Sequence, residues 1–228
     1  MTGYRWLLFD ADNTLFDFDA AEEAALTRTL TQYGLSADEG TKGRYRAVNA
    51  ALWAAFDRGE VDQETLVVER FARFLAGEGK PGDAAEWNRT YLDGLAQGNA
   101  LLPGAEALCR ALAGRYVLAL ATNGVPRVQR RRLEMSPLAP LFGERVYISG
   151  ELGCRKPERR YFEKVLAALG AEPRETLVIG DSLSSDIQGA ANAGLDSVWL
   201  NLRGKASGAV RPTYEVPGFG RLAGLLGV

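Results

Sequence analysis

The feature that most constrains the fold is an alternation of short apolar runs with helical stretches in the second half of the chain. The apolar runs have the composition of buried strands and lie at residues 117–121, 146–148, 177–179 and 198–200. The helical stretches lie near residues 104–113, 126–133, 158–170 and 184–193. Strands that alternate with helices pair in parallel, and the helices then cover both faces of the sheet. The pattern predicts an α/β fold with a Rossmann-like, doubly wound parallel sheet.

An apolar strand at residues 6–9 opens the chain, and the long stretch that follows reads as helix. Apolar residues recur there at helical spacing over residues 21–33, 45–56, 67–75 and 87–95. Glycines such as Gly34 and Gly59 end the periodic segments. We therefore expect a small helical bundle, residues 16–97, inserted into an α/β core made of residues 1–15 and 98–228.

Composition excludes several kinds of partner. The chain has 228 residues, 46% of them hydrophobic and 25% charged, which is typical of a globular protein with a sizeable core. A formal net charge of -2 argues against a nucleic-acid polymer or an anionic membrane as the main partner. The longest apolar run is too short to cross a bilayer, and two cysteines are too few for a disulfide framework. We expect a cytoplasmic protein.

The sequence contains no histidine. This absence excludes Ser-His-Asp and Cys-His nucleophilic sites, histidine general bases and zinc held by histidine. Proton transfer near neutral pH must then fall to a carboxylate, a lysine, a tyrosine or a thiol.

The opening strand runs directly into Asp10-Ala11-Asp12, which places two carboxylates at the end of a buried element. Alternate residues of an extended chain point to the same side, so Asp10 and Asp12 can converge on one ligand. Two such carboxylates repel unless a cation lies between them or one holds a proton, and hard oxygen ligands suit Mg2+. The same residues are also typical of a surface turn that caps a helix.

Polar residues follow three of the later apolar runs as well. Thr122-Asn123-Gly124 follows the run at 117–121, and Lys156 comes shortly after the next one. Gly180-Asp181 ends the third, with Asp186 close behind. Ligands of open α/β sheets bind beyond the carboxyl ends of the strands, so these side chains are candidates for one cleft. Taken singly, they are equally typical of a turn, a solvated lysine and helix caps.

These residue types fit phosphoryl transfer. An aspartate can attack a phosphoryl group and form an aspartyl phosphate, which water then cleaves. Mg2+ and a lysine are needed nearby to offset the negative charge. Thr122 and the backbone N–H of Asn123 are candidates for holding phosphoryl oxygens, and Asp12 is the candidate for protonating the leaving oxygen.

In this order the motifs resemble those of the haloacid dehalogenase superfamily. The matching residues are Asp10-Ala11-Asp12-Asn13-Thr14, Thr122, Lys156 and Gly180-Asp181 with Asp186. The resemblance implies that Asp10 is the nucleophile and a Mg2+ ligand, and that Asp12 is the acid/base with its carbonyl on the metal. It further implies that Thr122 binds the phosphate, that Lys156 contacts both the nucleophile and the phosphate, and that Asp181 is a metal ligand.

Two further expectations come with this resemblance. Asp186 would support the metal or Lys156 from nearby. The helical insert, residues 16–97, is similar to the cap of the superfamily, which closes over the cleft and selects the substrate.

Within the superfamily, the chain resembles the house-cleaning pyrimidine 5'-nucleotidases. The resemblance is carried by residues 9–19, by the segment 47–53, by Arg70-Phe71 and by the ending Trp199-Leu200-Asn201. It implies a phosphoric monoester hydrolase acting on small nucleoside 5'-monophosphates. Phe16, Phe18 and Trp53 are then candidates for stacking on a base, and Asn49 or Arg70 for bonding to base or sugar. Packing inside the cap is the alternative for the aromatic residues.

Other activities stay open on the sequence alone. A phosphatase or mutase of small sugar phosphates would share the motifs. A 2-haloacid dehalogenase would use the same aspartate on carbon, but has no evident need for Asp12. A phospho-accepting switch without turnover would have little reason to carry both a cap and a complete acid/base set.

Overall fold

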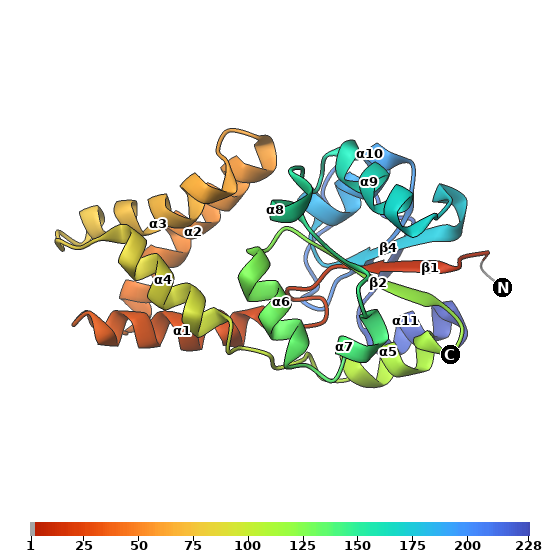
Figure 1. Cartoon of the computed structure of the whole chain (residues 1–228), viewed down its shortest axis with the longest axis horizontal. Helices are drawn as coiled ribbons and strands as arrows, with labels where there is room; N and C mark the ends of the chain where they lie inside the picture. The colour runs from red at the N-terminus through yellow and green to blue at the C-terminus, as the bar shows by residue number, and fades with distance from the viewer. Residues whose placement is uncertain (1–2) are drawn as a thin grey trace. The chain divides into compact units, whose positions relative to one another are not determined.

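The computed structural model describes residues 3–228, which form two compact units (Figure 1). The first unit runs up to Asp17 and resumes at Asn99, and the second spans Phe18–Gly98. These points lie close to the predicted domain limits. The roles of catalytic core and substrate-selecting cap stay predictions.

The first unit is built on a six-stranded sheet in which every neighbouring pair of strands is parallel. The strands are β1 (Trp6–Phe9), β2 (Val117–Thr122), β3 (Val146–Ile148), β4 (Thr176–Gly180), β5 (Asp196–Leu200) and β6 (Tyr214–Val216). Their order is β3-β2-β1-β4-β5-β6, so the chain winds from β1 to one edge and then from β4 to the other. The predicted doubly wound α/β fold is confirmed.

Helices cover both faces of this sheet. They are α5 (Ala105–Ala113), α6 (Pro126–Glu134), α7 (Ala139–Phe142), α8 (Ser149–Leu152), α9 (Arg159–Leu169), α10 (Gln188–Ala193) and α11 (Phe219–Leu226). In Figure 1, α9 and α10 lie on one side of the sheet, and α5, α7 and α11 lie on the other. Successive side chains of β1 point to opposite faces of the sheet. Leu8 packs with the α9 and α10 side chains, whereas Leu7 and Phe9 pack on the opposite face.

The structure adds elements that periodicity did not predict. The strand β6 and the helices α7 and α8 are only three or four residues long, too short to show a period. The helix expected near residues 158–170 is α9 and begins at Arg159, and the Lys156–Pro157 peptide bond is cis. The helix expected from residue 184 begins as a short π-helical segment, Leu183–Ile187, before α10. The segment 204–212 is a loop.

The second unit contains the four expected helices. They are α1 (Phe18–Gln32), α2 (Glu39–Arg58), α3 (Gln63–Gly77) and α4 (Ala84–Leu95). The last three each begin after an aspartate whose side chain accepts a backbone N–H of the first turn: Asp38, Asp62 and Asp83. Gly59 ends α2 with a φ of 84°, a left-handed conformation in which glycine avoids the usual steric cost.

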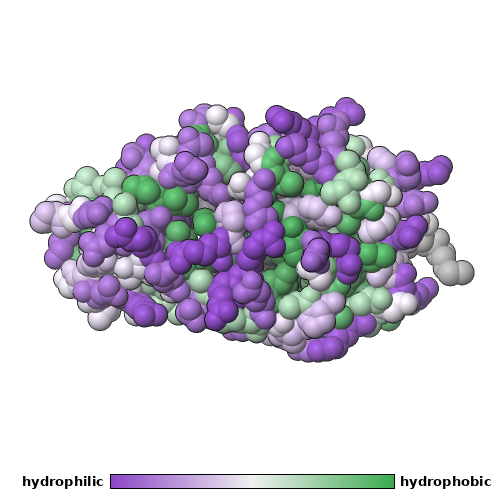
Figure 2. Space-filling model, in the orientation of Figure 1, coloured by the Kyte–Doolittle hydropathy of each residue, from purple (hydrophilic) through white to green (hydrophobic). Residues whose placement is uncertain are grey.

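Large aromatic side chains fill the interior of the second unit. Tyr45 packs against Phe71, Phe74 and Tyr91 with ring centroids 5.1 to 5.7 Å apart. Across residues 3–228, Leu202 and Val228 are the large hydrophobic residues that stay exposed, and the face in Figure 2 is mostly hydrophilic with scattered hydrophobic patches. Within the same residues, no helix combines the length and apolar character that a membrane crossing requires.

Candidate active site

The sheet register brings the predicted motifs to one edge. Phe9, the last residue of β1, lies opposite Leu120 of β2 and Ile179 of β4. The backbone N–H of Asp10 continues this pattern and donates to the carbonyl of Ile179 over 2.9 Å. The residues that directly follow β1, β2 and β4 therefore meet at the carboxyl ends of three adjacent strands, where open α/β sheets bind ligands.

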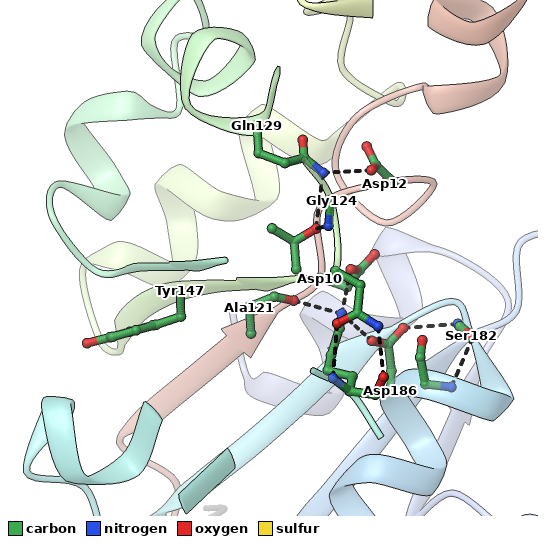
Figure 3. A network of polar contacts seen from close by, with 12 residues as sticks. Asp10, Asp12, Ala121, Gly124, Gln129, Tyr147, Ser182 and Asp186 are labelled. Carbon is green, nitrogen blue, oxygen red and sulfur yellow. Dashed lines mark hydrogen bonds and ion pairs between the residues drawn. The ribbon is translucent and has the colours of Figure 1, made fainter. Parts of the chain in front are cut away.

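Lys156 is buried at the centre of this edge. Its Nζ donates to Oδ1 of Asp10 over 2.7 Å, to Oδ1 of Asp186 over 2.6 Å and to the carbonyl of Ala121 over 2.8 Å (Figure 3). An ammonium group has three donors, so these contacts use all of them. With only 2% of its surface exposed, Lys156 is a core ion-pair residue and not a solvated one.

Burial and charge shift the titration of this pair. Burial raises the pKa of Asp10 to about 8; the positive charge of Lys156 opposes the rise, and the charges of Asp186 and Asp181 add to it. Burial alone lowers the pKa of Lys156, but the negative charges of Asp10 and Asp186 outweigh burial and raise it. Lys156 is therefore a fixed positive charge. Ionisation of the neighbouring Asp10 is costly unless a further cation, such as a metal ion, lies beside it.

Asp186 supports Lys156 and does not cap a helix. Its Oδ2 accepts the backbone N–H of Ser182 over 3.1 Å, while its Oδ1 accepts from Lys156. The cap of the π-helical segment is the Ser182 hydroxyl, which accepts the N–H of Ser185. Gly180 leaves the space for this arrangement, since a Cβ there would lie 2.2 Å from Oδ2 of Asp186.

Three carboxylates form a cluster with the chemistry of a Mg2+ site. Asp10, Asp181 and Asp186 each place an oxygen within 4.8 Å of the others. Each oxygen of Asp186 already accepts a hydrogen bond, from Lys156 or from the Ser182 N–H, and the role of Asp10 and Asp181 as Mg2+ ligands stays a prediction. Burial raises the pKa of Asp181 to about 6, as expected for a carboxyl group crowded by other acids. The all-oxygen donor set fits Mg2+.

A pocket of about 130 Å3 opens beside Asp181 in the same unit. Asn13, Asp17, Asn201 and Lys205 are among the residues that line it. The Nζ of Lys205 lies 3.8 Å from Oδ2 of Asp181, so a cation already stands near this carboxylate. The pocket therefore opens onto Asp181, one of the three clustered carboxylates.

Two residues of α6, Gln129 and Arg132, hold the carboxylate of Asp12. The sequence did not mark either of them as a site residue. Oδ2 of Asp12 accepts from Nε2 of Gln129 over 2.7 Å (Figure 3), and Oδ1 forms an ion pair with Nη1 of Arg132. Gln129 and Arg132 lie on α6 between the buried Val128 and Leu133. Their spacing with the apolar Val128 and Leu133 on one helix face is the signal that could have found them.

Thr122 and Asn123 also make bonds that the sequence could not specify. The Thr122 hydroxyl accepts from the N–H of Gly124 over 3.2 Å and from Nε2 of Gln129 over 3.0 Å. The Asn123 side chain brackets the backbone of Lys156: its Oδ1 accepts the N–H of Lys156 over 2.9 Å, and its Nδ2 donates to the carbonyl over 2.8 Å. The Asn123 amide therefore connects two of the motifs. The phosphate-binding role expected at Asn123 concerned its backbone N–H and stays a prediction.

The five residues predicted to contact a base or sugar fall in different places. Phe16 lies in the core of the first unit, 1% exposed, with the Arg132 guanidinium 4.8 Å above its ring. The Arg132 guanidinium therefore covers a face of the Phe16 ring on which a base would have to stack. Phe18 begins α1 and is partly exposed.

The other three belong to α2 and α3 of the second unit. Trp53 packs edge-on against Phe56 at 5.4 Å. Arg70 is 3% exposed and donates to Asn49 over 3.3 Å and to Asn88 over 2.9 Å. Contacts inside the second unit thus account for Trp53, Asn49 and Arg70, and their contact with a substrate stays a prediction.

A family profile of haloacid dehalogenase-like hydrolases matches residues 4–194. The chain belongs to this family. The pyrimidine 5'-nucleotidase PynA of Streptococcus pneumoniae is 40% identical over 93% of this chain and 91% of its own length. The pyrimidine 5'-nucleotidase YjjG of Escherichia coli is 32% identical over 98% of both chains.

A solved structure of the HAD-hydrolase YfnB from Bacillus subtilis bound to magnesium is also similar to this haloacid dehalogenase-like hydrolase. It superposes with a TM-score of 0.93 at 35% identity, covering 99% of each chain. The predicted superfamily and the predicted class of enzyme, a hydrolase with relatives named as phosphomonoester hydrolases, are confirmed.

Proposed function

We propose that this hydrolase is a Mg2+-dependent phosphatase that cleaves nucleoside 5'-monophosphates, with pyrimidine nucleotides as the preferred class, through an aspartyl phosphate on Asp10. The observation that carries the proposal is the buried set of Asp10, Lys156 and Asp186, with Asp12 two residues from the nucleophile. A nucleophile, a fixed positive charge and a second carboxylate are the groups that such a reaction needs.

In the first step, Asp10 attacks the phosphorus atom, and the bond between phosphorus and the 5'-oxygen of the nucleoside breaks. Asp12 gives its proton to that oxygen, because an alkoxide is a poor leaving group. In the second step, water attacks the aspartyl phosphate and releases phosphate from Asp10, and Asp12 takes the proton of the water. Asp12 is therefore restored, and the net reaction consumes one water molecule.

The other residues stabilise charge. Lys156 holds Asp10 in place and offsets the negative charge that builds up on the phosphoryl oxygens. Thr122 and the backbone N–H of Asn123 would donate to those oxygens. Asp10 and Asp181 would hold Mg2+, with Asp186 behind them; the ion supplies positive charge against the phosphoryl group when it is bound.

The substrate class rests on the relatives. Two proteins named as pyrimidine 5'-nucleotidases cover more than nine-tenths of this chain at 40% and 32% identity. Asp12 argues against carbon–halogen cleavage, which releases a halide that needs no proton.

The test is phosphate release from a panel of nucleoside monophosphates and small sugar phosphates, with Mg2+ and with a chelator. We expect Mg2+-dependent turnover concentrated on pyrimidine monophosphates. Asp10→Asn should reduce kcat by about a thousandfold or more, since it removes the nucleophile. An exposed aspartate of the second unit, Asp93→Asn, serves as the matched control and should leave turnover unchanged.

Other outcomes would overturn parts of the proposal. Turnover limited to sugar phosphates would keep the chemistry and contradict the nucleotide class. Full activity of Asp10→Asn would contradict the aspartyl phosphate. Chloride release from a 2-haloacid without phosphate release would contradict the phosphatase itself.

A further inference from the structure

A buried polar clamp holds the carboxylate of Asp12 from both sides. Arg132 contacts Oδ1, and Gln129 donates to Oδ2 over 2.7 Å. Both come from α6 at positions i and i+3, so they share one helix face. The side chains of the clamp are almost fully enclosed, with Gln129 2% and Arg132 0% exposed, whereas 27% of the Asp12 side chain is exposed.

The clamp fixes its own geometry. Arginine is a donor only, so the Gln129 oxygen must face Arg132, which donates to it over 3.2 Å. The Gln129 NH2 group then points to the opposite side, where it donates to Asp12 and, over 3.0 Å, to the Thr122 hydroxyl. The Arg132 guanidinium in turn lies against the ring of Phe16 at 4.8 Å. No member of the chain Arg132, Gln129, Asp12 can rotate without breaking another contact.

The clamp leaves Asp12 free to exchange a proton. An ionised carboxylate offers about four acceptor positions, and Arg132 and Gln129 take one on each oxygen. Each oxygen of Asp12 keeps another position for the proton that it gives and takes back.

We propose that Gln129 and Arg132 are positioning residues for the acid/base Asp12, and that they align its carboxyl group with the phosphate bound at Thr122. The inference rests on the phosphatase activity proposed above. Neither residue touches the reacting atoms; both act through Asp12. Loss of the clamp should therefore slow the two proton-transfer steps and leave substrate binding nearly unchanged.

The choice of substrate makes this role measurable. The 5'-oxygen of uridine 5'-monophosphate needs a proton as it leaves, whereas the nitrophenolate of p-nitrophenyl phosphate leaves without one. Transfer of the phosphoryl group to Asp10 should thus depend on the clamp for the first compound and not for the second. Release of phosphate from Asp10 needs Asp12 as a base with either compound.

The test compares Arg132→Met and Gln129→Met with wild type in Mg2+. For uridine 5'-monophosphate we expect kcat to fall about 10- to 100-fold, part of the usual contribution of a general acid, with KM within about threefold. With p-nitrophenyl phosphate, rapid mixing should show a burst of nitrophenolate at nearly the wild-type rate, followed by slowed turnover. Arg132→Lys keeps a charge and should recover part of kcat.

Two further variants test whether the position of Gln129 matters and whether the effect is specific to the clamp. A Cβ on Gly124 would lie 2.1 Å from Nε2 of Gln129, so Gly124→Ala should displace Gln129 and reproduce the Gln129→Met pattern. Arg131→Met changes the exposed neighbour of Arg132 on the same helix and is the control expected to match wild type.

Circular dichroism checks the fold of each variant. Gln129→Met leaves no buried charge unpaired, so it remains informative even where Arg132→Met unfolds.

Each remaining result contradicts the inference in a distinct way. Unchanged kcat in both methionine variants, a rise in KM alone, or an equal loss of the first step with both esters would overturn the positioning role and keep the phosphatase. A wild-type enzyme that releases no phosphate from any monoester would overturn the phosphatase and the inference together.

Discussion

The Nζ of Lys156 lies 2.7 Å from Oδ1 of Asp10, although 146 positions separate the two residues in the sequence. The same ammonium group reaches Asp186 over 2.6 Å. One buried cation thus joins the ends of three chain segments, after β1, before α9 and after β4. Its removal is the most direct test of what holds the site together.

Lys156→Met should destabilise the protein and abolish turnover. It leaves Asp10 and Asp186 buried without their cation, a change that typically costs about 3–5 kcal/mol of unfolding free energy. Urea unfolding in the presence of a chelator measures the loss. Arg159→Met, which removes an exposed cation three residues further on, should change stability by less than about 0.5 kcal/mol. A loss below about 1 kcal/mol for Lys156→Met would contradict the ion pair.

Metal-free protein should become less stable as the pH rises from about 4 to 8. The pKa of Asp10 is raised from 3.8 to about 8 and that of Asp181 to about 6, so the folded state binds protons in this window that the unfolded state has lost. Stability falls with pH wherever the folded state binds more protons. Thermal unfolding at several pH values in a chelator checks the sign; stability that rises over this window would contradict it.

Added Mg2+ should reverse that trend. The ion competes with the protons on Asp10 and Asp181, so its affinity and its stabilising effect should grow as the pH rises through 6 to 8. Unfolding with and without Mg2+ at pH 6 and pH 8 measures the difference. In Asp10→Asn the dependence on pH between 6 and 8 should largely disappear.

Gly180→Ala should disrupt the site through a single methyl group. The new Cβ would lie 2.2 Å from Oδ2 and 2.3 Å from Cγ of Asp186, so Asp186 must move away from Lys156. We expect a loss of about 1–3 kcal/mol in stability, typical of overpacking, and at least a tenfold fall in kcat. Gly220→Ala is the control: nothing lies within 4 Å of its Cβ, and alanine in α11 should stabilise slightly. Equal effects of the two changes would contradict the steric argument.

Asn123→Ala should show whether the Asn123 amide holds Lys156. The change removes both hydrogen bonds to the Lys156 backbone and leaves a buried lysine segment unsupported, at a cost of about 1–3 kcal/mol. Activity should fall with it, because Lys156 loses its alignment with Asp10. Asn192→Ala removes two exposed bonds, one to the carbonyl of Pro157 and one from the Gln188 side chain, and should cost far less. If both variants behave alike, the amide bracket has no special role.

The sequence revealed the long elements because their patterns are local. The strands at 117–121, 146–148, 177–179 and 198–200 and the four helices of residues 18–98 were all predicted within a few residues. The strands stand out as continuous apolar runs and the helices by apolar residues at helical spacing, and glycines mark helix ends. The short elements β6, α7 and α8 lack such a signal.

The site was predicted unevenly for the same reason. Asp10 and Asp12 follow β1, Lys156 and Asp186 come shortly after β3 and β4, and their order along the chain pointed to one cleft. Gln129 and Arg132 lie inside α6, away from a strand end, so no local motif marked them as partners of Asp12. An arginine in a run of three reads as a solvated face until the fold shows which one is buried.

The sequence by itself determined the α/β fold, the order of the motifs and the exclusion of histidine chemistry, since each depends on residue types and their spacing. Only the tertiary structure decided which carboxylate meets which cation: Lys156 lies on Asp10 and Asp186, and Arg132 lies on Asp12. It also showed that the Asn123 side chain supports Lys156 and that Phe16 is core. Such pairings depend on register and close packing between distant segments, and those contacts form only when the sheet brings the segments together.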